Sequence, residues 1–163
     1  MTTIDQLLDN ARTYAERFDK GGLPMPPGLG VAVVTCMDAR VNVYGILGLT
    51  EGDAHVIRNA GGVITEDAVR SLAISQRLLG TREIMLIHHA DCGMRTFSDE
   101  EFKAQIEVDT GIRPTWNPEA FVDSPADVRQ SINRLRASAS LPHRDAIRGF
   151  VYDESTGSLQ EAA

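Results

Sequence analysis

Two short runs, Val31–Thr35 and Glu83–His88, constrain the fold of this chain more than any other feature, because they are almost continuously apolar. Such runs are typical of strands buried on both faces, as in a parallel sheet. A weaker strand is predicted at His55–Arg58, and apolar residues at helical spacing predict a helix over Glu66–Leu79, ended by Gly80. Strands that alternate with helices predict an α/β fold with a mostly parallel sheet flanked by helices.

The C-terminal part continues this alternation. Helices are predicted at Ser98–Thr110 and at Asp127–Ala137, followed by a strand at Gly149–Asp153. The turn residues Ser155–Gly157 then reverse the chain into a short strand near Leu159. We therefore expect an antiparallel strand near the C-terminus.

The first 30 residues are predicted to form an N-terminal helical arm and a loop. Thr3–Phe18 has the apolar spacing of an amphipathic helix, and Asp19–Gly30 holds four glycines and three prolines. The apolar stripe of such an arm needs a surface to cover it, and we expect that surface on a second copy of the chain. The sequence thus predicts a single domain over 1–163, with 1–30 as its arm, and at least a homodimer.

The charge balance excludes several kinds of partner. The chain of 163 residues has 16 basic and 23 acidic side chains, a net charge of −7. This surplus of acid argues against binding to nucleic acid or to an anionic membrane. No apolar run approaches the roughly 18 residues of a membrane span, and the acidic start of the chain does not resemble a secretory signal. We expect a cytoplasmic protein.

Both cysteines of the chain follow predicted strands. Cys36 comes directly after the first strand, and Cys92 follows the third, with His89 three residues before it. Ligands of open α/β sheets bind beyond the carboxyl ends of the strands, where these side chains can meet. Thiolate and imidazole are preferred ligands of Zn²⁺, and two cysteines with one histidine leave a fourth position open. The alternatives are two separate buried thiols and a redox pair.

Asp38 and Arg40 follow Cys36 on the same predicted loop. The two side chains can form a carboxylate–guanidinium pair, which at an ordinary surface position would matter little. Close to a metal ligand, however, the carboxylate can either accept a hydrogen bond from water on the metal or bind the ion itself. Which of these occurs depends on whether Arg40 holds Asp38 back.

These motifs together carry a family resemblance. The Cys-x-Asp-x-Arg element at 36–40 and the His-x-x-Cys element at 89–92 flank the segment Arg-Asn-Ala-Gly-Gly at 58–62. In order and spacing they resemble the β-class carbonic anhydrases. The segments Arg70–Gly80 and Gly111–Trp116 resemble those of the short mycobacterial-type members. The resemblance runs from about Val31 to Gly93.

The resemblance implies roles for individual residues. Cys36, His89 and Cys92 would bind one Zn²⁺ per chain, and Asp38 and Arg40 would form the catalytic dyad. The implied activity is the reversible hydration of carbon dioxide to bicarbonate and a proton, in a homodimer or a dimer of dimers. The fourth zinc position would be open to water, or occupied by Asp38 in a closed, inactive form.

Other features qualify this implication. Members with an inhibitory bicarbonate site have a tryptophan at the position of Ala39, so the resemblance does not imply that site here. Gly61 and Gly62 would let the backbone approach a small substrate closely and are expected to line its pocket. The alternatives are a zinc hydrolase of a similar small electrophile, such as carbon disulfide, and a zinc-binding protein without catalysis.

Overall fold

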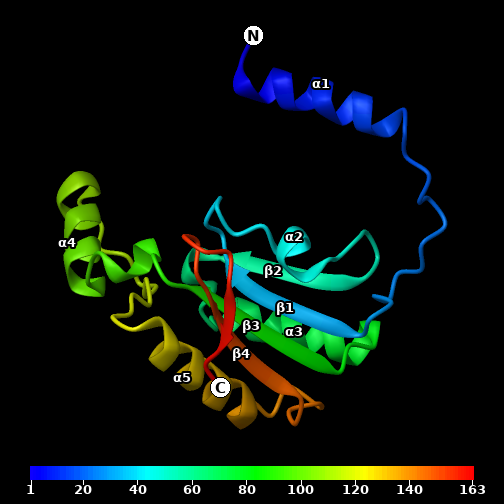
Figure 1. Cartoon of the computed structure of the whole chain (residues 1–163). Coiled ribbons are helices and arrows are strands. Elements are labelled where there is room, and N and C mark those ends of the chain that lie inside the picture. Colours follow the sequence, from blue (N-terminus) through cyan, green and yellow to red (C-terminus); the bar gives the residue numbers. More distant parts are fainter.

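A single five-stranded sheet organises the computed structural model, which describes residues 1–163 (Figure 1). The strand order is β2-β1-β3-β4-β5. The first four strands of that order run parallel, and β5 is antiparallel to β4. The predicted α/β class, with its antiparallel C-terminal strand, is confirmed. The strands are β1 (Val31–Cys36), β2 (Ala54–Asn59), β3 (Glu83–His89), β4 (Ile147–Tyr152) and β5 (Leu159–Glu161).

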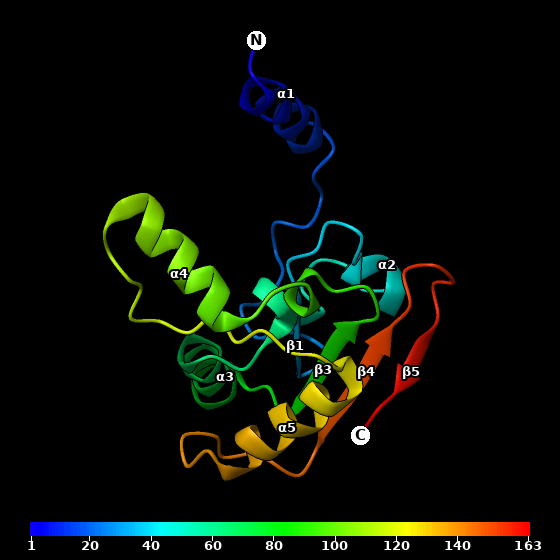
Figure 2. The ribbon, with the colours of Figure 1, turned by 90° about the vertical axis from the view of Figure 1, so that its left-hand side faces the viewer.

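Helices cover both faces of the sheet, which explains why the central strands lack polar alternation. Figure 2 shows α3 and α5 on one face of the sheet. Their apolar side chains pack there against alternate residues of the strands. On the other face, α2 closes a smaller apolar cluster around Val33 and Ile87. The helices are α1 (Thr3–Ala15), α2 (Val43–Leu47), α3 (Glu66–Leu79), α4 (Asp99–Thr110) and α5 (Ser124–Ala137).

Helices α2 and α5 differ most from the sequence prediction. Helix α2 was not predicted, because its five residues are too few to show a helical period; Asn42 caps it and Gly48, with a φ of 65°, ends it. Helix α5 begins at Ser124 rather than at the predicted Asp127, and so includes Pro125. A proline is tolerated in the first turn because its missing N–H has no partner there.

The N-terminal arm leaves its apolar stripe uncovered. Helix α1 contains no buried residue, and Ile4, Leu7 and Leu8 are between 51% and 69% exposed. Figure 1 shows α1 standing apart from the sheet. The predicted arm is confirmed as a helix, although it ends at Ala15 rather than Phe18. No helix of this structure combines the length and the apolar character required to span a membrane.

Candidate functional site

The three predicted metal ligands converge at the carboxyl edge of the sheet. Cys36 is the last residue of β1, His89 is the last residue of β3, and Cys92 lies just beyond it. Their ligand atoms all lie within 4.8 Å of one another, and all three residues are buried. The parallel pairing of β1 with β3 brings these two strand ends side by side. Both cysteines are free.

The histidine nitrogen that faces this cluster has no hydrogen-bond partner. His89 Nε2 is buried and unpaired, whereas its Nδ1 contacts the carboxylate of Glu154. Leaving a buried polar atom unpaired costs about 1–3 kcal/mol, so it calls for an explanation. A metal ion bound by the two sulfurs and this nitrogen supplies one. The donor set therefore fits a thiophilic divalent ion.

The two thiols are electrostatically unequal. The neighbouring Cys92 side chain, against the effect of burial, lowers the pKa of Cys36 to about 4, with help from His89 and from backbone N–H groups. One of these groups is the N–H of Gly61, 3.3 Å from Cys36 Sγ. Conversely, the contact with Cys36 and burial together raise the pKa of Cys92 well above its ordinary value. Binding of a metal ion must therefore displace a proton from Cys92.

Asp38 and Arg40 form the predicted ion pair. Arg40 donates from Nε to Asp38 Oδ1 at 3.0 Å and from Nη2 to Oδ2 at 2.8 Å. This two-point pairing holds the pKa of the Asp38 carboxyl well below its usual range, against the effect of burial. Asp38 Oδ2 lies 3.9 Å from His89 Nε2, so the carboxylate borders the ligand cluster while the guanidinium holds it.

Further contacts fix the dyad and its loop. Arg40 Nη1 donates to Asp91 Oδ2 at 2.8 Å, and its Nη2 donates to the Asp91 carbonyl oxygen at 2.8 Å. Arg58 at the end of β2 donates from Nε to the Cys36 carbonyl at 2.9 Å and from Nη2 to the Asp38 carbonyl at 2.8 Å. Arg58 therefore ties the loop after β1, which carries Asp38 and Arg40, to strand β2.

The glycines of the same segment pack directly behind Cys36. Gly61 and Gly62 are buried and have φ angles of 85° and 65°. A Cβ on Gly62 would lie 2.8 Å from the Thr35 carbonyl carbon and 2.9 Å from the Cys36 nitrogen. Only glycine allows this approach, which places the Gly61 N–H beside the Cys36 sulfur. That Gly61 and Gly62 line a substrate pocket remains a prediction.

Sequence reasoning missed Glu154 altogether. This residue lies in the turn between β4 and β5, and its side chain is only 9% exposed. It accepts a hydrogen bond from the Asp91 N–H at 3.1 Å and contacts His89 Nδ1. An acid in a polar turn, 65 residues after its partner, leaves no signal in the sequence.

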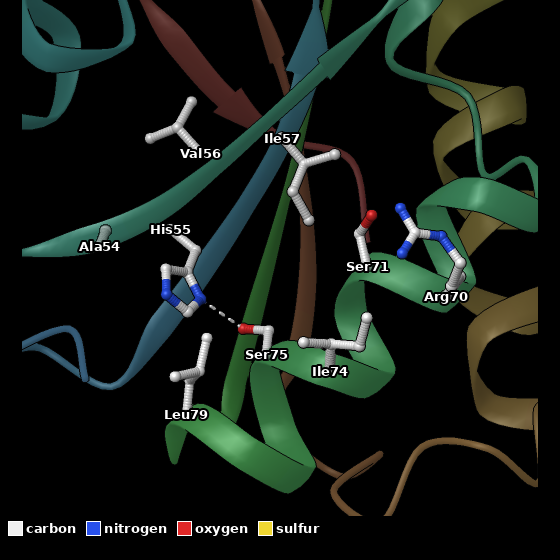
Figure 3. Close-up of a pocket in the computed structure, with 9 residues that line it drawn as sticks. All are labelled: Ala54, His55, Val56, Ile57, Arg70, Ser71, Ile74, Ser75 and Leu79. Atoms are coloured by element: carbon white, nitrogen blue, oxygen red, sulfur yellow. Dashed lines mark hydrogen bonds between the residues drawn. The ribbon is translucent and has the colours of Figure 1, made fainter. Parts of the chain in front are cut away.

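A groove between β2 and α3 is a separate feature of the surface (Figure 3). Its volume is about 390 Å³, and none of the three converging ligands lines it. Its histidine is already paired, since His55 Nδ1 lies 2.7 Å from Ser75 Oγ, which lies 2.6 Å from Thr81 Oγ1. The groove therefore shows no open constellation of reactive groups.

Fold and site together define the class: an α/β protein with a buried Cys₂His cluster that could hold a metal ion, and an Asp–Arg pair at the carboxyl edge of its sheet. The family model of carbonic anhydrase matches residues 31–159, and the chain belongs to the β-carbonic anhydrase family. The resemblance seen in the sequence is thereby confirmed.

Individual relatives extend this likeness over nearly the whole chain. Beta-carbonic anhydrase 1 of Mycobacterium tuberculosis is 57% identical over 161 residues, covering 99% of this chain and 98% of the relative. The crystal structure of a carbonic anhydrase from Streptococcus mutans superposes with a TM-score of 0.94 at 40% identity, covering 100% and 99% of the two chains. A carbon disulfide hydrolase of Acidianus is 43% identical over 183 residues, covering 97% of this chain and 88% of that protein.

Proposed function

We propose that this protein is a zinc-dependent carbonic anhydrase that catalyses the reversible hydration of carbon dioxide to bicarbonate and a proton. The observation that carries the proposal is the buried cluster of Cys36, His89 and Cys92, whose free His89 nitrogen borders a carboxylate held by Arg40. The 57% identity to a mycobacterial β-carbonic anhydrase supports the same activity.

Zinc is the metal that suits this donor set best. Two thiolates and one imidazole leave one position of a tetrahedral ion open, which is the pattern of a catalytic rather than a structural zinc site. When bound, zinc supplies a nucleophile from water near neutral pH. Two free cysteines that serve as ligands also suit the reducing cytoplasm, where we place the protein.

The dyad orients the reactants. Ionised Asp38 can accept a hydrogen bond from the attacking nucleophile, so that a lone pair of the nucleophile points at the substrate carbon. Arg40 keeps that carboxylate in place through two parallel hydrogen bonds and so prevents it from becoming a fourth ligand of the metal ion. Arg58 fixes the carbonyl groups of the same loop. Together these residues hold Asp38 where it can accept a hydrogen bond from the nucleophile without binding the metal ion.

Carbon disulfide is the second candidate substrate. It is favoured by the 43% identity to a carbon disulfide hydrolase. Both molecules are linear, uncharged electrophiles that the same residues can serve. The cluster alone therefore does not separate the two reactions.

One preparation tests both substrates. The zinc-loaded protein is assayed by stopped-flow for hydration of carbon dioxide and, in parallel, for release of sulfide from carbon disulfide. We expect fast hydration and no sulfide. Sulfide release without hydration would overturn the proposal in favour of the hydrolase. If the protein holds zinc but performs neither reaction at any pH from 6.5 to 9, the proposal is wrong and the protein is a non-catalytic zinc-binding protein.

We also propose that the protein is at least a homodimer. The support is helix α1, whose apolar side chains have no partner within the chain. Burying such a stripe is favourable by about 25 cal/mol for each Å² of apolar surface removed from water. A second copy of the chain carries the same uncovered stripe, so contact with that copy would remove apolar surface of both arms from water.

A further inference from the structure

We infer that Glu154 is a positioning residue, which fixes the His89 ring so that Nδ1 carries the proton and Nε2 is free to bind the metal. The inference deepens the proposed function, since it rests on the same metal site. Glu154 contacts the site but lies 65 residues after His89 in the sequence, outside every motif of the site.

The contacts of the carboxylate are few and specific. Glu154 Oε1 contacts His89 Nδ1, and the Asp91 N–H donates to Oε1 at 3.1 Å and to Oε2 at 3.3 Å. The same Oε1 lies 4.0 Å from Arg40 Nη2, at the outer limit of an ion pair. The carboxylate is 9% exposed and the His89 ring is fully buried. The Glu154 side chain therefore has fixed partners at the end of β3 and in the segment after it. Asp91 of that segment is also bound by Arg40, which follows β1.

Strand register places Glu154 at this position. His89 at the end of β3 pairs with Tyr152 at the end of β4, and the Ala90 N–H donates to the Tyr152 carbonyl at 2.9 Å. The following turn is closed by Asp153, whose Oδ1 accepts from the Ser155 N–H at 2.8 Å. The hairpin thus holds the residue between these two, Glu154, beside the imidazole.

The acceptor character of a carboxylate selects one tautomer of the ring. An ionised carboxylate has no proton to give, so His89 Nδ1 must be the donor of their hydrogen bond. The lone pair then lies on Nε2, the buried nitrogen that has no other partner and faces both cysteine sulfurs. A carboxylate behind a metal-binding histidine also increases the basicity of the ligand, and removing it typically weakens metal binding 10- to 100-fold.

Three variants separate positioning from general stability. Glu154→Leu removes the acceptor, whereas Glu154→Gln keeps one acceptor oxygen for Nδ1–H. Glu161→Gln is the matched control, because Glu161 lies in the same hairpin and pairs with Arg148 at 2.7 Å on the exposed surface. Zinc affinity is measured by competition with a chelator, and the tautomer of His89 is read from ¹⁵N chemical shifts of the metal-free protein at pH 9.

We expect Glu154→Leu to bind zinc 10- to 100-fold more weakly and to lose the pure Nδ1–H signal of the wild type. Glu154→Gln should stay within a few-fold of the wild type, and Glu161→Gln should match it. A folded Glu154→Leu variant with wild-type zinc affinity would overturn the inference, as would a Glu154→Gln variant no better than Glu154→Leu. If Glu154→Leu does not fold, the wild-type spectrum decides, because an Nε2–H tautomer there contradicts the inference.

Zinc affinity and tautomer are independent of the reaction. A wild-type protein that shows the expected tautomer and affinity, yet hydrates no carbon dioxide, would refute the proposed function and leave the role of Glu154 intact. Normal hydration together with an unaltered affinity in Glu154→Leu would refute the inference alone.

Discussion

The substitution Gly62→Ala tests how tightly the 58–62 segment must pack behind the ligand Cys36. Gly62 has a φ of 65°, which costs an L-residue about 1–2 kcal/mol. Its new Cβ would lie 2.8 Å from the Thr35 carbonyl carbon and 2.9 Å from the Cys36 nitrogen, and both are backbone atoms that cannot swing aside. Forcing an extra carbon into a packed core costs a further ~1–3 kcal/mol. We expect a loss of about 2–5 kcal/mol in the free energy of unfolding.

A second glycine provides the control for backbone strain alone. Gly80 at the end of α3 has a φ of 78°, but nothing lies within 4 Å of a Cβ placed there. Gly80→Ala should therefore lose only about 1–2 kcal/mol. Both variants are unfolded in urea in the metal-free form at one protein concentration, since assembly and metal binding both add stability. Equal losses in the two variants would refute the argument from close packing.

Four further outcomes follow from the site and the arm. Arg40→Ala should keep its zinc but lose at least ~100-fold of its hydration rate at neutral pH, and wild-type turnover there would show that Asp38 needs no restraint. Asp38→Ala should also keep its zinc but be slow at every pH, and a rate that recovers at high pH would contradict the orienting role. Because the raised pKa of Cys92 leaves a proton to be displaced, zinc affinity should increase at least ~10-fold per pH unit between pH 6 and 8, whereas a flat profile would contradict this proton release. Deleting residues 1–18 should give monomers at micromolar concentration in sedimentation, and an unchanged assembly would exclude the arm as its cause.

Much of the fold could be predicted because burial on both faces leaves a direct trace in the sequence. Val31–Thr35 has no polar alternation, and the structure covers it with helices on both sides. Helix α2 left no such trace, because five residues do not complete two helical turns. The predicted start of α5, at Asp127, lay after Pro125, although the first turn of a helix accepts a proline.

The same contrast holds for the site. The convergence of Cys36, His89 and Cys92 could be predicted, because each follows a strand of a parallel sheet and such strand ends meet at one edge. The place of Glu154 could not, because it depends on the pairing of β3 with β4 and on a turn closed by Asp153. The hydrogen bonds of Arg58 to two carbonyl groups likewise depend on the three-dimensional path of the loop.

The most direct test of the account is a zinc titration of the metal-free protein, followed by stopped-flow hydration of carbon dioxide. We predict a rate that rises in proportion to bound zinc and stops rising at one zinc per chain. A Cys92→Ser variant, which removes one of the three ligands, should hold little zinc and show no activity under the same conditions. A metal-free protein that hydrates carbon dioxide as fast as the loaded one would contradict the account, as would a Cys92→Ser variant with full zinc and full activity.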